Sequence, residues 1–241
     1  MANSYFQFKQ FIIHQDRSAM KVTTDSCLFG AWVAEEAGSQ QSEAGNVLDI
    51  GTGTGLLSLM LAQKNNSLIT SVEIDKDAFL QASENITVSP WKDRIKIFHA
   101  DIREFSSPVL YDIIVSNSPF YENEWPSGNS KRNTAHHSSE LSFEDLVAII
   151  SAMLKPKGKF YLLLPYKRNE EIMKLLDLRE MTVTQNILVR QSYDHNYFRF
   201  MIEGSFEKSA NTLTKEIAIK NKSNEYTKEF TALLKDYYLY M

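Results

Sequence analysis

The chain contains a single cysteine, Cys27, among its 241 residues. A lone cysteine excludes an internal disulfide and a zinc site built from several thiolates, and it is typical of a protein from a reducing compartment. Nowhere do as many as about 18 apolar residues run together, and no basic leader precedes an apolar run near the start. We therefore expect a cytoplasmic protein without a membrane span, a signal peptide or a bound metal.

An excess of positive charge is also missing, because the formal net charge is −4. The charge is unevenly distributed, however: it is −8 over residues 1–154 and +4 over residues 155–241. Since fields decay over about 8 Å at physiological salt, a basic part of an acidic chain can still present a local positive face. Ordinary solvated lysines would give the same count, so charge alone does not identify a partner.

Short apolar segments alternate with segments of helical pattern through most of the chain. The expected strands are residues 47–50, 67–74, 94–99, 111–116 and 159–164. Strands that alternate with helices predict an α/β fold, with a mostly parallel sheet that is covered by helices on both faces.

The last third of the chain has a different pattern. Residues 182–190 and 198–206 are two extended segments with too few residues between them for a crossover helix, so we expect an antiparallel hairpin at one edge of the sheet. Residues 215–240 are helical in pattern. The two hairpin strands bring the expected sheet to seven strands, and we expect residues 1–241 to form one domain.

A glycine-rich turn follows the first strand of this pattern, in Asp49-Ile50-Gly51-Thr52-Gly53-Thr54-Gly55. Glycines allow a sharp turn that approaches a ligand closely, and the helix that follows offers free N–H groups. Dinucleotide folds use a different spacing to hold pyrophosphate, which the carboxylate of Asp49 would repel. That carboxylate suits the amino group of S-adenosylmethionine. We therefore predict that Asp49, Gly51, Gly53 and Gly55 bind this cofactor.

Two further acids follow the next two strands. Glu73 ends the second strand, where a carboxylate can accept hydrogen bonds from both ribose hydroxyls of an adenosine. Asp101 follows the third strand and can accept from the adenine amino group. Either acid alone could simply cap a helix, but open α/β sheets bind ligands at the carboxyl ends of their strands. Glu73 and Asp101 are therefore predicted to complete the cofactor site.

The fourth strand leads into Asn117-Ser118-Pro119-Phe120. The string resembles the Asn-Pro-Pro-aromatic element of methyltransferases that act on amino groups of adenine, guanine or glutamine. In such enzymes two acceptors, the Asn side-chain oxygen and the next backbone carbonyl, bind both N–H groups of the target and stabilise the geometry of the transition state. Phe120 would stack on the base. Ser118 replaces the usual first proline, yet its carbonyl can still accept; a plain turn is the alternative.

The strand order and these motifs together resemble the Rossmann-like class I methyltransferases. The segments Phe8–Phe11, Gln15–Arg17, Ala19–Asp25 and Leu28–Trp32 resemble the start of the bacterial tRNA(Val) adenine-N6 methyltransferases, and the resemblance extends to Asp236–Leu239. It implies that residues 1–45 cover the cofactor pocket of a core at 46–241. Lys21, Thr23 and Thr24 would then line the pocket together with Asn117.

The resemblance implies methyl transfer from S-adenosylmethionine to N6 of an adenine in tRNA, adenine 37 of tRNA(Val), by a monomeric enzyme. Tyr193, His195, Tyr197 and Arg199 of the hairpin would suit RNA or a plain strand surface, and we assign them to strand surface. Three alternatives stay open. They are a protein glutamine-N5 methyltransferase, an rRNA or DNA amino-methyltransferase, and a cofactor-binding module without catalysis.

Overall fold

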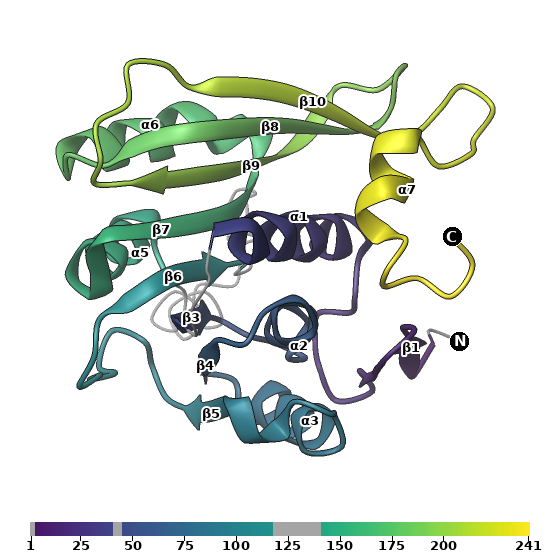
Figure 1. Ribbon diagram of the computed structural model, residues 1–241, viewed down its shortest axis with the longest axis horizontal. Helices are drawn as coiled ribbons and strands as arrows, with labels where there is room; N and C mark the ends of the chain where they lie inside the picture. The colour runs from purple at the N-terminus through teal and green to yellow at the C-terminus, as the bar shows by residue number, and fades with distance from the viewer. Residues whose placement is uncertain (1–2, 41–44, 118–140) are drawn as a thin grey trace, which may run out of the picture.

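Eight strands form the central sheet in the computed structural model, which describes residues 3–40, 45–117 and 141–241. From top to bottom in Figure 1 their order is β10-β8-β9-β7-β6-β3-β4-β5. The strands are β3 (Asn46–Ile50), β4 (Leu68–Glu73), β5 (Ile95–His99), β6 (Tyr111–Ser116), β7 (Leu154–Pro165), β8 (Thr182–Ser192), β9 (Tyr197–Ser205) and β10 (Leu213–Lys220). Within this sheet β9 is antiparallel to both of its neighbours, β7 and β8, and the other described pairs are parallel. The predicted fold class, a mostly parallel sheet with an antiparallel pair, is confirmed.

Helices cover both faces of this sheet. The helices on one face are α1 (Thr24–Gln40), α2 (Leu56–Lys64), α3 (Lys76–Thr87) and α7 (Lys228–Leu234), and those on the other are α5 (Phe143–Met153) and α6 (Asn169–Leu178). Short 3-10 turns lie at η1 (Lys92–Arg94) and η2 (Tyr166–Arg168). The chain moves outward from β3 to β5 and then returns to β6, so right-handed crossovers place the later helices on the opposite face. One hydrophobic core lies on each side.

The helical prediction for residues 215–240 is wrong for its first part. Residues 213–220 form β10, which pairs parallel with β8, and only Lys228–Leu234 are α-helical. Ile217 and Ile219 are buried in the same core, as expected for side chains two residues apart on a strand. The β8–β9 hairpin therefore does not form the edge of the sheet, because β10 covers β8 and adds an eighth strand.

The N-terminal residues pack beside the C-terminus. Strands β1 (Tyr5–Gln7) and β2 (Ile12–His14) form a small antiparallel sheet, and Phe8 makes a β-bridge with Tyr238. Residues 15–23, which we call the strap, then run from β2 to the start of α1. Several of them line the pocket described below.

The sheet places four segments of the chain at one edge. Strand β3 lies between β4 and β6, so the order of the strands reverses beside β3. Strands β3 to β6 are parallel to one another, and their carboxyl ends therefore meet at the same edge. A crevice beside such a reversal is where open α/β sheets bind ligands. A ligand site is therefore expected among the segments that follow β3, β4, β5 and β6.

Candidate active site

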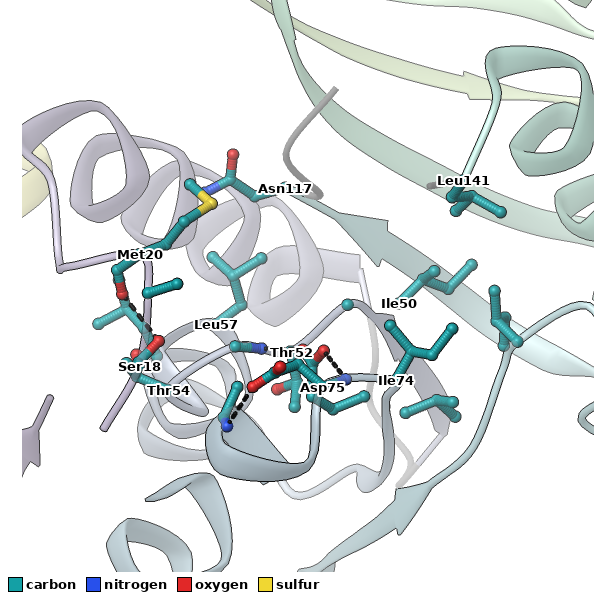
Figure 2. A pocket seen from close by; sticks show the side chains of 18 of the residues that line it. Ser18, Met20, Ile50, Thr52, Thr54, Leu57, Ile74, Asp75, Asn117 and Leu141 are labelled. Carbon is teal, nitrogen blue, oxygen red and sulfur yellow. Dashed lines mark hydrogen bonds between the residues drawn. The ribbon is translucent and has the colours of Figure 1, made fainter. Parts of the chain in front are cut away.

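A pocket of about 470 Å³ lies at this edge of the sheet (Figure 2). Its walls are residues 18–23 of the strap, 50–54, 72–75 and 100–103, with Ser26, Leu56, Leu57, Ala78, Asn117 and Leu141. The volume lies within the range of roughly 300–1,000 Å³ that is usual for small-molecule sites. The pocket therefore combines the strap with the ends of all four parallel strands.

The glycine turn after β3 has left-handed backbone at three positions, with φ of 69° at Gly51, 58° at Gly53 and 82° at Gly55. Side chains other than glycine are strained there. Gly51 and Gly53 line the pocket, and a Cβ built on Gly53 would meet no atom within 4 Å. A Cβ on Gly55 would instead touch Ala82 of α3, at 3.5 Å. Gly55 therefore starts α2 and packs on α3, and is not among the pocket-lining residues.

Glu73, at the end of β4, lies in the wall of the pocket and is 8% exposed. One carboxylate oxygen accepts from the backbone N–H of Gly53 at 2.8 Å, and the other accepts from that of Asp75 at 2.9 Å. Burial raises the pKa of Glu73, and these two N–H donors partly oppose the rise. Because a carboxylate has about four acceptor positions, both oxygens retain capacity for hydroxyl donors.

Asp101, after β5, also lines the pocket. Its carboxylate accepts from Arg103 Nε at 2.9 Å and from the backbone N–H of Arg103 at the same distance. The hydrogen bonds from the Arg103 side chain hold the pKa of Asp101 below its usual value. Asp101 is thus kept ionised as an acceptor at the pocket wall.

Asp49 does not line the pocket. Its side chain is fully buried beneath the glycine turn, where the hydroxyls of Thr52 and Ser58 both donate to Oδ2 at 2.6 Å. Oδ1 has no hydrogen-bond partner among the described residues. Burial raises the pKa of Asp49 to about 6. In this geometry the carboxylate supports the glycine turn from its buried side. The sequence had predicted a contact of this carboxylate with the amino group of the cofactor.

The raised pKa of Asp49 predicts a pH-dependent stability. The folded chain holds this proton to a higher pH than the unfolded chain, so the contribution of Asp49 to stability falls between about pH 4 and pH 6. Relative to Asp49→Asn, the unaltered chain should lose ~3 kcal/mol of unfolding free energy over that interval. Urea titrations of both proteins at pH 4 and pH 7 measure the difference. A difference that does not change with pH would contradict the burial of an ionisable Asp49.

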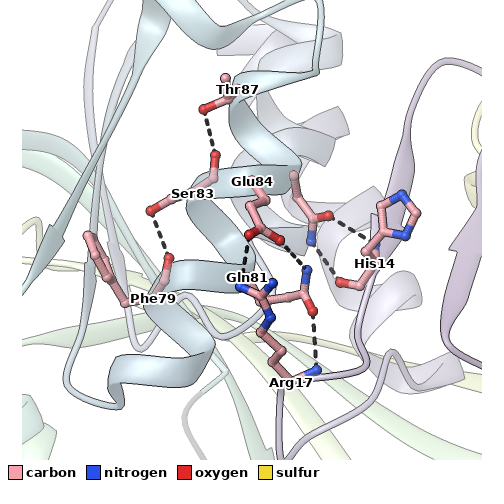
Figure 3. A network of polar contacts seen from close by, with 8 residues as sticks. His14, Arg17, Phe79, Gln81, Ser83, Glu84 and Thr87 are labelled. Carbon is pink, nitrogen blue, oxygen red and sulfur yellow. Dashed lines mark hydrogen bonds and ion pairs between the residues drawn. The ribbon is translucent and has the colours of Figure 1, made fainter.

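The end of β2 and the strap are fastened to α3 by polar contacts, several of which are drawn in Figure 3. Asn85 Oδ1 accepts from the backbone N–H of His14 at 2.9 Å, and Asn85 Nδ2 donates to the carbonyls of His14 and Thr54 at 2.8 and 2.9 Å. The backbone N–H of Arg17 donates to Gln81 Oε1 at 3.2 Å. Asn85 therefore joins the N-terminal segment to the glycine turn.

We expect Asn85→Ala to loosen the cofactor pocket. Asn85 is 1% exposed, and its removal leaves the backbone groups of His14 and Thr54 without these partners. The expected loss of unfolding free energy is ~2–4 kcal/mol, with a weaker affinity for S-adenosylmethionine, the ligand that the sequence predicts for this pocket. Glu84→Ala is the matched control on the same helix, because its ion pair with Arg17 is about half exposed and should contribute less than ~1 kcal/mol. Urea unfolding and calorimetric titration give both quantities; equal effects of the two substitutions would contradict this role.

Three of the remaining predicted residues line the pocket. Asn117 follows β6 and lines the pocket, one residue after Ser116, which pairs with Ile50 of β3. Lys21 and Thr23 of the strap also line it, whereas Thr24 begins α1 and is not among the lining residues. In the view of Figure 2, Asn117 and the strap's Met20 lie on one side of the pocket. The predicted residues Ser118, Pro119 and Phe120 lie outside the described residues.

The apolar residues of the pocket wall, and Asn85 behind it, were not predicted from the sequence. Met20, Leu57, Ile74 and Ile102 line the pocket. Ile74 directly follows Glu73, and Ile102 directly follows Asp101, so their position after predicted strands could have indicated them. Asn85 gave no such signal, because a polar residue within a helix usually faces solvent.

Comparison with known proteins gives the family. The model of the methyltransferase small domain matches residues 37–180. A tRNA1(Val) (adenine(37)-N6)-methyltransferase of Dyadobacter fermentans is 39% identical, over 98% of each chain. The proteins of that name from Parabacteroides distasonis and Proteus mirabilis are 37% and 36% identical; the alignments cover 100% of both chains in the first case, and 98% of this chain and 94% of the relative in the second.

Solved structures agree on the fold. A protein of Agrobacterium tumefaciens described as a predicted O-methyltransferase superposes with a TM-score of 0.64 at 14% identity, over 87% of this chain and 95% of that one. The glycopeptide N-methyltransferase MtfA, crystallised with S-adenosyl-L-methionine, gives a TM-score of 0.55 at 13% identity, over 74% of this chain and 94% of that one. The domain match and the full-length relatives go further than fold: the chain belongs to the methyltransferase small domain family and, within it, to the bacterial tRNA1(Val) (adenine(37)-N6)-methyltransferases.

Proposed function

We propose that this chain transfers a methyl group from S-adenosylmethionine to N6 of an adenine in tRNA, with adenine 37 of tRNA1(Val) as the target that its relatives' name specifies. One observation carries the proposal. Asn117, the acceptor residue of the target site, lines the same pocket as Gly53, Glu73 and Asp101, which suit an adenosine. Donor and target sites thus meet at the carboxyl end of β6.

The described residues of the pocket fit the methyl donor. The open space over Gly53 leaves room for a ligand close to the backbone. Glu73, fixed by two backbone N–H groups, has acceptor capacity for a ribose diol. Asp101 accepts from three N–H groups of Arg103 and keeps about one acceptor position for an adenine amino group. Lys21 and Thr23 are near enough to line the donor's other end. When bound, the donor supplies an electrophilic methyl group on a sulfonium.

Asn117 prepares the target amine for this methyl group. The lone pair of an exocyclic adenine nitrogen is delocalised into the ring, so the nitrogen is a poor nucleophile. When the Asn117 side-chain oxygen accepts one of its N–H groups, and the carbonyl of Ser118 the other, a pyramidal nitrogen with an available lone pair is favoured. A strong base is not required, because the nitrogen loses its proton readily once it carries the new bond. The roles of Ser118, Pro119 and Phe120 remain predictions from the sequence.

We also propose that the enzyme acts as a cytoplasmic monomer of one domain, in which the N-terminal segment 1–45 covers the donor pocket through the strap. The lone and buried Cys27 and the contacts of the strap with α3 support this. In residues 3–40, 45–117 and 141–241, every helix is too short or too polar to cross a bilayer. The same residues contain no cluster of three or more acidic, His or Cys side chains suited to a metal ion.

The substrate is tested by offering several amino groups to one enzyme. The chain is incubated with methyl-labelled S-adenosylmethionine and, separately, with total tRNA, rRNA, duplex DNA and a peptide release factor, and the products are digested and identified. We expect label only in N6-methyladenosine from tRNA, and none when adenine 37 of a tRNA1(Val) transcript is replaced by guanine. Label in methylglutamine, or in DNA or rRNA alone, would overturn the tRNA assignment.

A further inference from the structure

Four side chains form a ladder of flat groups at the same edge of the sheet as the pocket. Tyr166 begins η2 after β7, Arg190 lies near the end of β8, Tyr193 is in the β8–β9 turn, and Tyr197 begins β9. We call these four residues the aromatic ladder. The sequence alone favoured a plain strand surface for Tyr193 and Tyr197, and did not single out Tyr166 or Arg190.

The members of the ladder contact one another in series. The rings of Tyr166 and Tyr197 have centroids 5.3 Å apart. The guanidinium of Arg190 lies 5.2 Å from the ring centroid of Tyr197 and 5.5 Å from that of Tyr193. A salt bridge of 2.5 Å between Arg190 and Glu216 of β10 fixes the guanidinium further. The ladder is therefore ordered before any ligand binds, which reduces the entropy lost on binding.

The ladder also offers exposed surface. Tyr166 is 36% exposed and Tyr193 is 47% exposed, although both are large aromatic residues. Lys167, next to Tyr166, is exposed and adds positive charge. Flat aromatic and guanidinium groups beside a cation are the surface on which unpaired RNA bases stack.

The position of the ladder relative to Asn117 follows from the sheet. Strands β6, β7 and β8 run in the same direction, so Asn117, Tyr166 and Arg190 all lie at their carboxyl ends. In the sheet, β7 separates β6 from β9, and β8 is one strand further. Tyr166, Tyr197 and Arg190 lie one to three strands from β6 and about three residues beyond the register of Asn117. At ~4.8 Å per strand and ~3.3 Å per residue, they lie roughly 11–18 Å from Asn117. The unpaired nucleotides that adjoin the target adenine can span this distance.

We propose that the aromatic ladder is a second RNA subsite, on which Tyr166 and Tyr193 stack the unpaired bases beside the target adenine. The inference rests on the proposed function, because it names how the RNA is held at the same edge. The ladder binds bases by their flat faces, so it contributes affinity and position for the loop without selecting the target base itself. Asn117 remains the residue that binds the target amine.

The test compares substitutions of Tyr166 and Tyr193 in the full chain. Tyr166→Ala, Tyr193→Ala and the double variant are assayed with a tRNA1(Val) transcript, together with Tyr166→Phe and Tyr193→Phe, which keep the rings. We expect each alanine variant to raise KM for tRNA by about five-fold or more and to change kcat and donor affinity by less than about three-fold. The phenylalanine variants should have the same KM for tRNA as the unaltered chain, because they keep the rings. Tyr240→Ala, which removes a tyrosine that is 95% exposed, is the control and should leave KM unchanged.

A second substrate separates stacking from a merely structural effect. The second substrate is a synthetic tRNA with an abasic nucleotide on either side of the target adenine. With it, the unaltered chain should show a KM as high as that of the alanine variants with intact tRNA. The alanine substitutions should not raise the KM for this substrate further. An additive loss, or an unchanged KM in the double variant with intact tRNA, would overturn the subsite while methyl transfer stands. If the unaltered chain places no label in tRNA, the proposed function fails, and the subsite fails with it.

Discussion

Replacing Asn117 with alanine is expected to lower kcat/KM for tRNA by about 1,000-fold and to leave the Kd of S-adenosylmethionine within about three-fold. Asn117 lines the pocket at the end of β6, and in the account above its side-chain oxygen acts on the amine only as the transition state forms. Loss of one preorganised polar group of this kind typically lowers kcat by roughly 10²–10³-fold, and loss of base positioning adds to it. Single-turnover rates with saturating tRNA, and calorimetry with the donor, give the two quantities.

Two related variants sharpen this prediction. Asn117→Asp keeps an oxygen acceptor of nearly the same shape but adds a charge, so its rate should lie between those of the unaltered chain and Asn117→Ala. Asn211→Ala, in the exposed segment between β9 and β10, is the control and should change neither rate nor affinity. If Asn117→Ala lost donor affinity and kept its rate at saturating donor, Asn117 would belong to the donor site and the acceptor role would be wrong.

Replacing Glu73 with alanine is expected to raise the Kd of S-adenosylmethionine by about 100-fold. Hydrogen bonds to a charged acceptor contribute ~1.5–3 kcal/mol each, and Glu73 offers its carboxylate to two ribose hydroxyls in the proposed complex. The substitution also removes the partner of the Gly53 and Asp75 backbone N–H groups, which hold the glycine turn to the end of β4. Both effects act on donor binding, so calorimetric titration measures them directly.

The control for Glu73 is another acid of the same region. Asp77 lies on the exposed first turn of α3, and Asp77→Ala should change the donor Kd by less than about two-fold. At saturating donor, Glu73→Ala should recover most of its kcat, because Asn117 is untouched. A variant with unaltered donor affinity and a lower kcat would place Glu73 in the chemistry and contradict its role in donor binding.

The parts of the site that the sequence predicted are those with a local cause. The glycine turn needs left-handed backbone within five residues, and a carboxylate that ends a parallel strand must lie at the edge where ligands bind. Gly51, Gly53, Glu73 and Asp101 accordingly line the pocket as predicted. Their function in cofactor binding is a prediction, which donor titration of the Glu73 variant tests.

The parts that the sequence did not predict depend on partners distant along the chain. Asp49 is buried and does not line the pocket, because the hydroxyls of Thr52 and Ser58 donate hydrogen bonds to its carboxylate and hold it there. Asn85 acquires its role only when the end of β2 packs against α3. Residues 213–220 form a strand because β8 offers a free edge, whereas their mixed polar and apolar sequence also fits a helix. Tertiary pairing decides such cases over local pattern.

A crystal structure of the chain with sinefungin and an anticodon stem-loop would test the acceptor geometry most directly. Sinefungin carries an amine in place of the donor's methyl group. We predict that Asn117 Oδ1 lies within hydrogen-bond distance of the target N6, with the target base between Asn117 and the sinefungin amine. An Asn117 amide turned away from the sinefungin amine, with no room for a purine beside it, would contradict the account.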